Sequence, residues 1–521
     1  MKKIRINLII AIVASMWCIQ IPLQAQVAPD ELSFIRKGVR RLIFDPDQSI
    51  RLAGLDPGKI IGLPVMHPIN HYSEVQAALA IQGDQLYIRS EGESQTGVWF
   101  GGFNPFATYT LDLTSSSGTG AIGFEFTSAD RENLLLITAG FTDSLLTGVH
   151  LKIRKGYELV RSEAIDVNLS GEEKTKGRLI LQMLGSGFIM YMEDQGLPKV
   201  IGQSDFSNYL DLRKKEFIHT FQSRLFVHLE DAQLAISKVE MAISTGVGQA
   251  DIRAITYENG EPFLELGRLW YTMSIRGRAL PHHLQGVFSM HPAVFDLRLE
   301  GIIVFDRKDG LLRNEIASHV FYDRKDKVWR GLTTGFSAYA NPIEKKQLLA
   351  IESTRDPRFG FSVMHAEPFG MVGDIEDPHI LYDAEAKKWR MLTCENQEGY
   401  KAILLESDHW NRGYQKIAGP VEHNSTGTSM QKIGEQWYCF SGSSEREIFI
   451  YTYPHLKEAG TLSMDLTPWN ESSGSRVWPN VVQLPEGYPV RYVALMMDRF
   501  NFPGMIGPHW SYGALYLYHA R

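Results

Sequence analysis

The second half of the chain repeats itself, and this repeat limits the folds that the chain can adopt. A strand-like run, a charged or polar turn and a second run near a tryptophan recur from residue 251 to residue 521. The clearest copies lie at 318–329, 377–389 and 428–437, and looser copies lie at 251–271 and 476–493. The period of about 50 to 65 residues is in the range of β-propeller blades. We predict a five-bladed propeller over residues 246–521, with two stacked sandwiches as the alternative.

The first half is rich in short alternating runs, and residues 45–245 predict a β-sandwich. Val149, Leu151 and Ile153 alternate with other residues, which is the period-two pattern of a strand. Strands at regular spacing with turn signals between them are typical of a sandwich. The last runs, 223–229 and 234–243, resemble the closing strands of concanavalin/laminin-G-like jelly rolls. Only residues 29–41 suggest a long amphipathic helix, so the predicted class is all-β, with an N-terminal jelly-roll sandwich followed by the propeller.

The N-terminus has the pattern of a secretory signal peptide. Lys2, Lys3 and Arg5 precede an apolar run over residues 6–17, and acceptable small residues for cleavage follow near Ala25. The run is shorter than the ~20 residues that a membrane span needs. We predict removal of residues 1–25, a secreted or periplasmic location, and an N-terminal segment at 26–44 ahead of the sandwich.

Composition excludes several classes of function. The 521 residues carry a formal charge of −7 with both signs interspersed, so no basic block indicates a nucleic-acid partner. No later stretch is long and apolar enough to predict a membrane span. Aromatic residues make up 11% of the chain, which suits a carbohydrate-facing protein or a large β core. Cys394 and Cys439 are the cysteines left after processing; we favour two buried thiols over one bridge.

The chemistry of a propeller is expected at the axis, where the innermost strands begin. Acidic residues fall at three such starts: Asp251, Glu315 and the cluster at 374–379. Carboxylates that converge on one small funnel repel each other, so one of them holds a proton near neutral pH. A general acid and a general base can arise in this way from the same side-chain type.

The segment Glu376-Asp377-Pro378-His379 is similar to the Glu-Gly-Pro-His motif of five-bladed-propeller glycoside hydrolases, namely family 43 and its relatives. The resemblance covers about half of the chain. It implies that Glu376 is the general acid, that Asp251 is the base, and that Glu315 orients and tunes the acid. It also implies inversion of configuration at the cleaved bond.

The sequence departs from this family in blades one and two. Asp251 is followed by isoleucine where the family has proline, and Asn314-Glu315 stands where an aspartate is usual. The candidate substrate-binding residues are Arg253, Asp377, His379, His423 and Arg476. The stretch 276–283, with two arginines and two histidines, either binds an acidic sugar or is a solvated loop. The repeated tryptophans are predicted to pack between blades.

These observations together predict an exported glycoside hydrolase, exo-acting and inverting, with the sandwich as an accessory domain. The alternatives are a non-catalytic carbohydrate-binding propeller and, with less support, a polysaccharide lyase. The partner is a carbohydrate, and the sequence says nothing of oligomeric state. No metal ligand set is predicted and no cofactor is required, although the resemblance allows a structural Ca²⁺ on the propeller axis.

Overall fold

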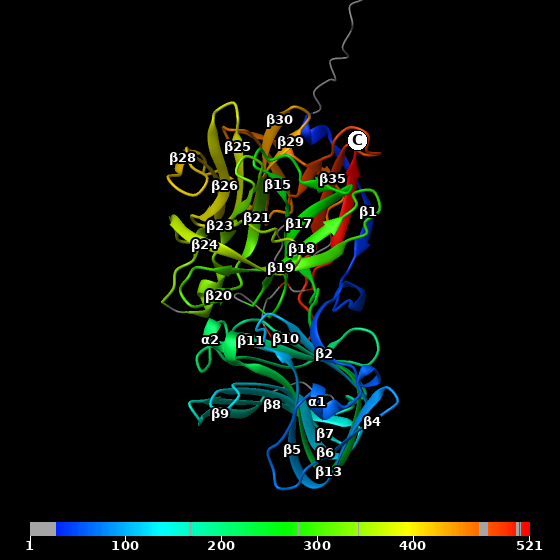
Figure 1. The fold of residues 1–521 in the computed structure, drawn as a ribbon. Helices are drawn as coiled ribbons and strands as arrows, with labels where there is room; N and C mark the ends of the chain where they lie inside the picture. The colour runs from blue at the N-terminus through cyan, green and yellow to red at the C-terminus, as the bar shows by residue number, and fades with distance from the viewer. Residues whose placement is uncertain are drawn as a thin grey trace, which may run out of the picture.

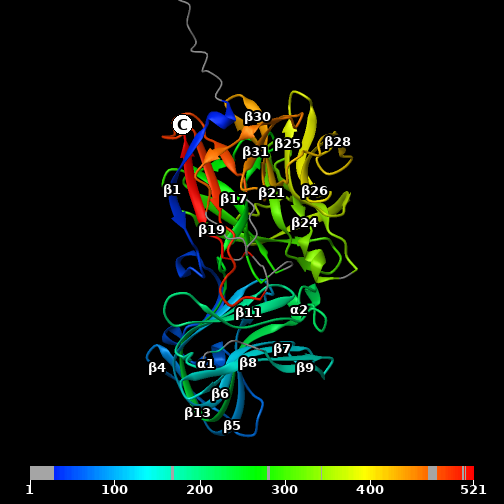
Figure 2. The same cartoon turned by 180° about the vertical axis from the view of Figure 1, so that it is seen from behind.

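The computed structural model describes residues 28–165, 169, 171–278, 282–341, 343–467, 478–506, 510 and 512–521. It contains a β-sandwich and a β-propeller stacked on each other (Figures 1 and 2). The predicted all-β class, with a sandwich followed by a propeller, is confirmed. Among the described residues, no helix is long and apolar enough to cross a membrane. The predicted signal peptide lies outside the described residues.

The sandwich is organised around three long strands that contribute to both of its layers. These are β5 (Gln85–Gly102), β6 (Thr108–Thr127) and β13 (Gln222–Ile243), and β13 pairs with the other two along most of its length. The shorter strands are β2 (Ile50–Leu55), β3 (Ile69–His71), β4 (Ala78–Gln82), β7 (Leu134–Thr142), β8 (Leu145–Lys155), β9 (Glu158–Ile165), β10 (Gly177–Met183), β11 (Gly187–Glu193) and β12 (Lys199–Asp205). The helical elements of this half are η2 (Pro46–Gln48), η3 (Pro57–Lys59), α1 (Leu63–Met66) and α2 (Lys215–Thr220).

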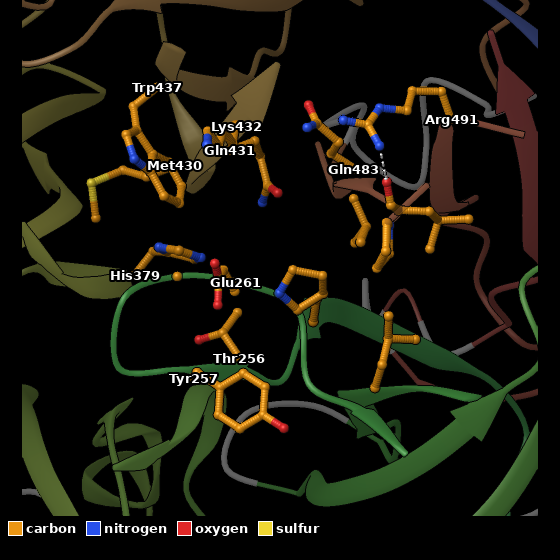
Figure 3. A pocket seen from close by; sticks show the side chains of 17 residues that line it. Thr256, Tyr257, Glu261, His379, Met430, Gln431, Lys432, Trp437, Gln483 and Arg491 are labelled. Atoms are coloured by element: carbon orange, nitrogen blue, oxygen red, sulfur yellow. Dashed lines mark hydrogen bonds between the residues drawn. The ribbon is translucent and has the colours of Figure 1, made fainter. Parts of the chain in front are cut away.

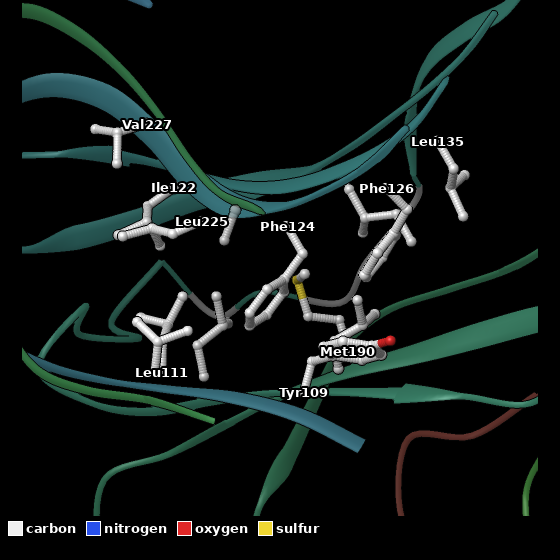
Figure 4. Packing of buried hydrophobic residues seen from close by; sticks show 14 of the residues in the cluster. Tyr109, Leu111, Ile122, Phe124, Phe126, Leu135, Met190, Leu225 and Val227 are labelled. Atoms are coloured by element: carbon white, nitrogen blue, oxygen red, sulfur yellow. The ribbon is translucent and has the colours of Figure 1, made fainter. Parts of the chain in front are cut away.

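The core of the sandwich lies between the two layers. Figure 4 shows Phe124, Phe126 and Leu225 pointing from one layer toward Tyr109 and Met190 of the other. All five side chains are fully buried. Because side chains alternate between the faces of a strand, each of these strands gives every second residue to this core.

The propeller has five blades of four antiparallel strands each. Blade one is β14 (Gln249–Ala254), β17 (Arg268–Ile275), β18 (Leu284–Met290) and β19 (Arg298–Asp306); blade two is β21 (Ile316–Asp323), β22 (Val328–Thr334), β23 (Gln347–Ser353) and β24 (Gly360–Val372). Blade three is β25 (Ile375–Asp383), β26 (Lys388–Asn396), β27 (Tyr400–Ser407) and β28 (Gln415–Ala418); blade four is β29 (Thr426–Ile433), β30 (Gln436–Gly442), β31 (Ile448–Thr452) and β32 (Glu458–Thr461). Minor elements are β15 (Thr256–Tyr257), β16 (Leu264–Glu265), β20 (Leu312–Arg313) and η4 (Phe336–Ala340).

Blade five is completed by the N-terminal segment. Its strands β34 (Val481–Gln483), β35 (Tyr492–Met497) and β36 (Leu515–Ala520) are followed at the edge by β1 (Ser33–Arg40). β1 is antiparallel to β36 and also meets β33 (Ser463–Met464). The helix predicted over residues 29–41 is therefore wrong, because only η1 (Pro29–Glu31) is helical there. Its apolar residues have the period of a strand, with Phe34 buried and Ile35 exposed.

The two domains share a buried interface. β10 and β11 are buried on both faces: Leu179, Leu181 and Met190 enter the sandwich core, whereas Ile189 and Tyr191 belong to a cluster with Phe502 and other residues of the propeller. The interface also contains ion pairs, such as Lys215 with Asp306 (2.7 Å). Cys394 and Cys439 are both buried and unbridged, as expected.

Candidate active site

Four of the innermost strands carry the same irregularity at the point where they reach the axis. Asp251, Ala317, Asp377 and Gly427 each adopt a positive φ, between 51° and 61°. The pairing register of each strand with its neighbour shifts there, which marks a β-bulge. These residues are therefore equivalent positions in blades one to four. Non-glycine residues avoid this conformation, and bulges that re-aim side chains are frequent next to active sites.

A cavity of about 410 Å³ opens at this end of the axis. Its lining comes from all five blades and combines carboxylates, cations and aromatic rings. The residues are Asp251, Arg276, Ile316, Phe336, Tyr339, Glu376, Asp377, Tyr400, Thr426, Ser444, Trp478, Arg499 and Trp510. The structure thus places Asp251 and Glu376, two of the three predicted catalytic residues, in one cavity with Asp377.

Asp251 is ion-paired inside the cavity. Nη2 of Arg276, on the loop after β17, donates to Oδ2 of Asp251 at 2.5 Å. Both side chains are almost fully buried, so little solvent weakens the interaction. The pair fixes the Asp251 carboxylate at the wall formed by blade one.

Glu376 is held by a lysine from blade two. Nζ of Lys346 donates to Glu376 (2.9 Å), to Tyr400 (3.0 Å) and to Asp374. Burial alone would raise the pKa of Asp374, but the hydrogen bonds from Lys346, Tyr400 and Asn396 outweigh it and lower the pKa to about 2. This network gives Glu376 a fixed position at the cavity wall.

Asp377 is the carboxyl group of the cavity whose pKa lies closest to neutral. Its side chain is buried in the cavity wall, and this burial raises its pKa to about 7. The neighbouring Glu376 and the more distant Asp251 raise it further, whereas Arg253 and the Gly427 N–H, which donates to Oδ2 at 2.8 Å, oppose the rise. Glu376 and Asp377 have ligand atoms within 4.8 Å of each other, so the charge of Glu376 lies close to the Asp377 carboxyl group.

The raised pKa of Asp377 predicts a pH-dependent loss of stability. Between the ordinary value of 3.8 and about 7, the unfolded chain releases this proton while the folded chain keeps it, so stability falls as pH rises through this window. Asp377→Asn removes the effect, which corresponds to at most about 4 kcal/mol. Denaturant titrations should show the variant more stable than wild type near pH 8 and similar to it below about pH 4. An equal difference at both pH values would contradict this assignment.

The described residues do not fit a cation at either candidate position. Glu376, Asp377 and Cys394 could present three ligand atoms, but Lys346 already pairs with Glu376, and burial raises the pKa of Asp377, which disfavours the ionised form that binds a metal. On the axis itself, where calcium was expected as one option, Arg253 donates to the carbonyl oxygens of Thr428 and of Asp377. A divalent cation there would meet the charge of the guanidinium.

Glu315 does not line the cavity. It is fully buried and accepts hydrogen bonds from the backbone N–H (2.8 Å) and the hydroxyl (2.7 Å) of Ser337. These bonds hold η4, whose Phe336 and Tyr339 do line the cavity. The equivalent of Asp251 in blade two is Ala317, two residues further along, so blade two supplies no carboxylate.

Three candidate substrate-binding residues lie elsewhere. Arg253 is buried on the axis, 1% exposed, and stacks over Trp478 at 4.8 Å. His379 lines a different cavity. His423 stacks on Phe449 and pairs with Glu445 and Glu458 at the surface of blade four. Arg476 lies outside the described residues.

The stretch 276–283 is neither a solvated loop nor a free basic patch where the structure describes it. Asp205 of the sandwich pairs with Arg278 (2.5 Å) and with His282 (3.0 Å). Arg276 is 3% exposed, and its carbonyl accepts from Gln182 of the sandwich. The sandwich therefore anchors the loop that carries the partner of Asp251.

The sequence did not indicate several residues of the site. Tyr400, Arg499 and Trp510 of the cavity wall, and Lys346 beside it, come from loops between strands or from strand ends, where no periodic pattern marks them. Trp478 lies inside the repeat copy at 476–493, and this position was the one available signal. The other wall residues reach the cavity only when the blades close around the axis, which no local pattern in the sequence shows.

No protein-family model and no curated protein matches the chain. Among solved structures, a GH43_1 enzyme from Xanthomonas citri is similar over 53% of this chain and 89% of its own, with 10% identity and a TM-score of 0.37. A GH43 β-xylosidase/α-arabinofuranosidase from a compost microbial metagenome has 14% identity, a TM-score of 0.37 and coverage of 53% and 92%. A GH62 α-L-arabinofuranosidase catalytic domain from Coprinopsis cinerea has 10% identity, a TM-score of 0.35 and coverage of 53% and 91%. The likeness concerns the fold alone.

Proposed function

We propose that this chain is a glycoside hydrolase whose active site is the cavity around Asp251, Glu376 and Asp377. The observation that carries the proposal is a close pair of carboxyl groups, one of them with a raised pKa, and a separate, ion-paired carboxylate in the same cavity. Glycosidic bond hydrolysis needs this combination, with one group to protonate the leaving oxygen and another to activate water. The Glu376–Asp377 pair acts as the acid, and Asp251 acts as the base.

The shape and lining of the cavity support a sugar as the ligand. Trp478, Trp510 and Phe336 provide apolar surface beside the carboxyl groups, and such mixed walls suit sugar rings. The loops of blades one and five that supply Arg276, Arg499 and Trp510 to the cavity also contact the sandwich, through Arg278 and Phe502. The sandwich therefore lies against one side of the cavity. Because a site blocked on one side favours cleavage at a chain end, we propose exo action. We also propose inversion, and export after cleavage near residue 25.

A test uses the chain from residue 26 with a panel of 4-nitrophenyl glycosides of pentoses and hexoses. We expect saturable release of nitrophenol from at least one glycoside. On an oligosaccharide with a poor leaving group, which needs protonation, the rate should fall as pH rises above about 7, because Asp377 then loses its proton. ¹H NMR of the first product should show the anomer opposite to that of the substrate. An oligosaccharide rate that does not change with pH across this range would contradict the assignment of the acid.

One observation favours a second candidate, a carbohydrate-binding propeller without activity. Blade two presents Ile316 and Ala317 where a third carboxylate would stand. Sugar binding in the cavity, with no hydrolysis of any glycoside or polysaccharide tested, would establish this reading instead.

A further inference from the structure

A second cavity of about 440 Å³ lies further along the propeller axis. The inner strands of blades one and four run from one cavity to the other. Blade one contributes Asp251 to the candidate active site and Ala254 and Thr256 to the second cavity, and blade four contributes Thr426 to the first and Met430 to the second. Strands rise about 3.3 Å per residue, so the two cavities are separated along the axis. The buried guanidinium of Arg253 fills the layer between them, because it bonds to backbone carbonyls of blades three and four.

A buried imidazole without a partner faces this second cavity. His379 is 3% exposed, and neither of its ring nitrogens has a hydrogen-bond partner in the described part of the chain. Its neighbour His319, stacked at 3.9 Å, uses both nitrogens: Nδ1 accepts from the Ile380 N–H, so Nε2 donates to Thr256. Burial lowers the pKa of His379 well below its usual value, so the ring is neutral. Figure 3 shows it pointing between Trp437 and Thr256.

The other polar groups of the cavity are also uncharged or already paired. Oε1 of Gln483 is buried without a partner, while its amide N–H donates to Gly434. Lys432 pairs with Glu435 (3.0 Å), Glu261 pairs with Arg324 (3.5 Å), and Arg491 donates to the Leu484 carbonyl (2.6 Å). The buried polar atoms that still need a partner, on His379 and Gln483, belong to neutral groups.

An indole ring forms part of the wall. Trp437 is partly exposed, unlike the buried Trp270 and Trp329 of other blades. Gly260 packs against it so closely that an added Cβ would lie 2.5 Å from the ring. Pro262 and Pro485 extend the apolar surface. A flat apolar wall opposite neutral hydrogen-bonding atoms matches a sugar, which has an apolar C–H face and hydroxyl groups that both donate and accept.

We propose that this second cavity binds a neutral carbohydrate of one or two rings, with a hydroxyl group on His379, another on Gln483 and the ring against Trp437. Unpaired buried polar atoms destabilise the folded chain, and the hydroxyl groups of a bound sugar would give them partners. The site is distinct from the proposed active site and does not depend on its activity.

The proposal is tested by ¹⁹F NMR of the chain from residue 26 labelled with 5-fluorotryptophan. The probes are D-glucose, D-galactose, D-xylose and L-arabinose, with D-glucuronate as a charged probe, and Trp437→Phe assigns the resonance. We expect at least one neutral sugar to shift the Trp437 signal in a saturable way, and glucuronate to leave it unchanged. His379→Leu and Gln483→Met should each weaken binding about tenfold, the equivalent of one lost hydrogen bond.

The matched control is Gln436→Met, an exposed glutamine next to Trp437 in blade four that does not line the cavity. It should bind the sugar as wild type does. The proposal is overturned if no neutral sugar shifts the Trp437 signal, or if the shift survives in the Gln483→Met chain at unchanged affinity. Shifts confined to Trp478 and Trp510 would report the proposed active site and would also overturn it.

Discussion

Asn in place of Asp251 is expected to lower kcat by about 10²–10⁴-fold on every substrate. The side chain keeps its shape but can no longer take a proton from water, and this step is needed whichever group leaves. Arg276, its partner at 2.5 Å, is then left without an opposite charge. The measurement is steady-state kinetics on an aryl glycoside and on an oligosaccharide with a poor leaving group.

Variants of Glu376 and Asp377, the proposed acid, should differ from the Asp251 variant when the aryl glycoside and the oligosaccharide are compared. Glu376→Gln and Asp377→Asn should lose about 10²–10⁴-fold in kcat on the oligosaccharide, and much less on the aryl glycoside, because an activated leaving group needs little protonation. Asp408→Asn is the matched control, since this carboxylate of blade three is exposed and pairs with Lys388 at 2.7 Å. Its kcat should equal that of wild type. Equal and mild losses in all the cavity variants would mean that the carboxyl groups only shape the cavity.

Removal of residues 26–40 is expected to destabilise the whole propeller. β1 closes blade five by pairing with β36, and Phe34 lies in a buried cluster with Tyr516 and Tyr518. A shortened chain would expose that apolar cluster and an unpaired edge, which favours aggregation. We expect little soluble protein and an early thermal transition, even though the deleted residues precede the sandwich in the sequence.

Two single substitutions separate this effect from loss of chain length. Phe34→Ala should lower the free energy of unfolding by about 3–5 kcal/mol, as for other buried aromatic residues. Ile35→Thr should have little effect, because Ile35 is 59% exposed on the other face of the same strand. Wild-type stability of the truncated chain would show that blade five closes without β1.

The sequence predicted those parts of the fold whose strands are neighbours in the chain. The tryptophans that open the second strands predicted the blades, and Trp270 and Trp329 are buried in a shared cluster, as packing between blades requires. β1 could not be predicted in this way, because its partner β36 lies at the opposite end of the chain. Its mixed burial pattern is compatible with a helix until that partner is known.

In the candidate site, too, the sequence predicted positions that depend on one strand but not those that depend on pairing with its neighbour. Asp251 and Glu376 could be placed because strand starts face the axis, and both line the cavity. Glu315 was assigned beside them, but the bulge in blade two puts Ala317 at the equivalent position and leaves Glu315 beneath η4. A bulge of one residue changes which side chain faces the axis, and its position depends on pairing with the next strand.

The most direct test of the proposed function is a crystal structure of the Glu376→Gln chain with an oligosaccharide that wild type cleaves. We expect a sugar ring in the cavity, with its glycosidic oxygen within about 3.2 Å of residue 376 or of Asp377 and a water on Asp251. The carboxyl groups on the two sides of the bond should then be about 6.5–9.5 Å apart, as inversion requires. An oligosaccharide bound outside this cavity would contradict the proposed function. An oligosaccharide in the cavity with Asp251 and residue 376 on the same side of its cleavable bond would also contradict it.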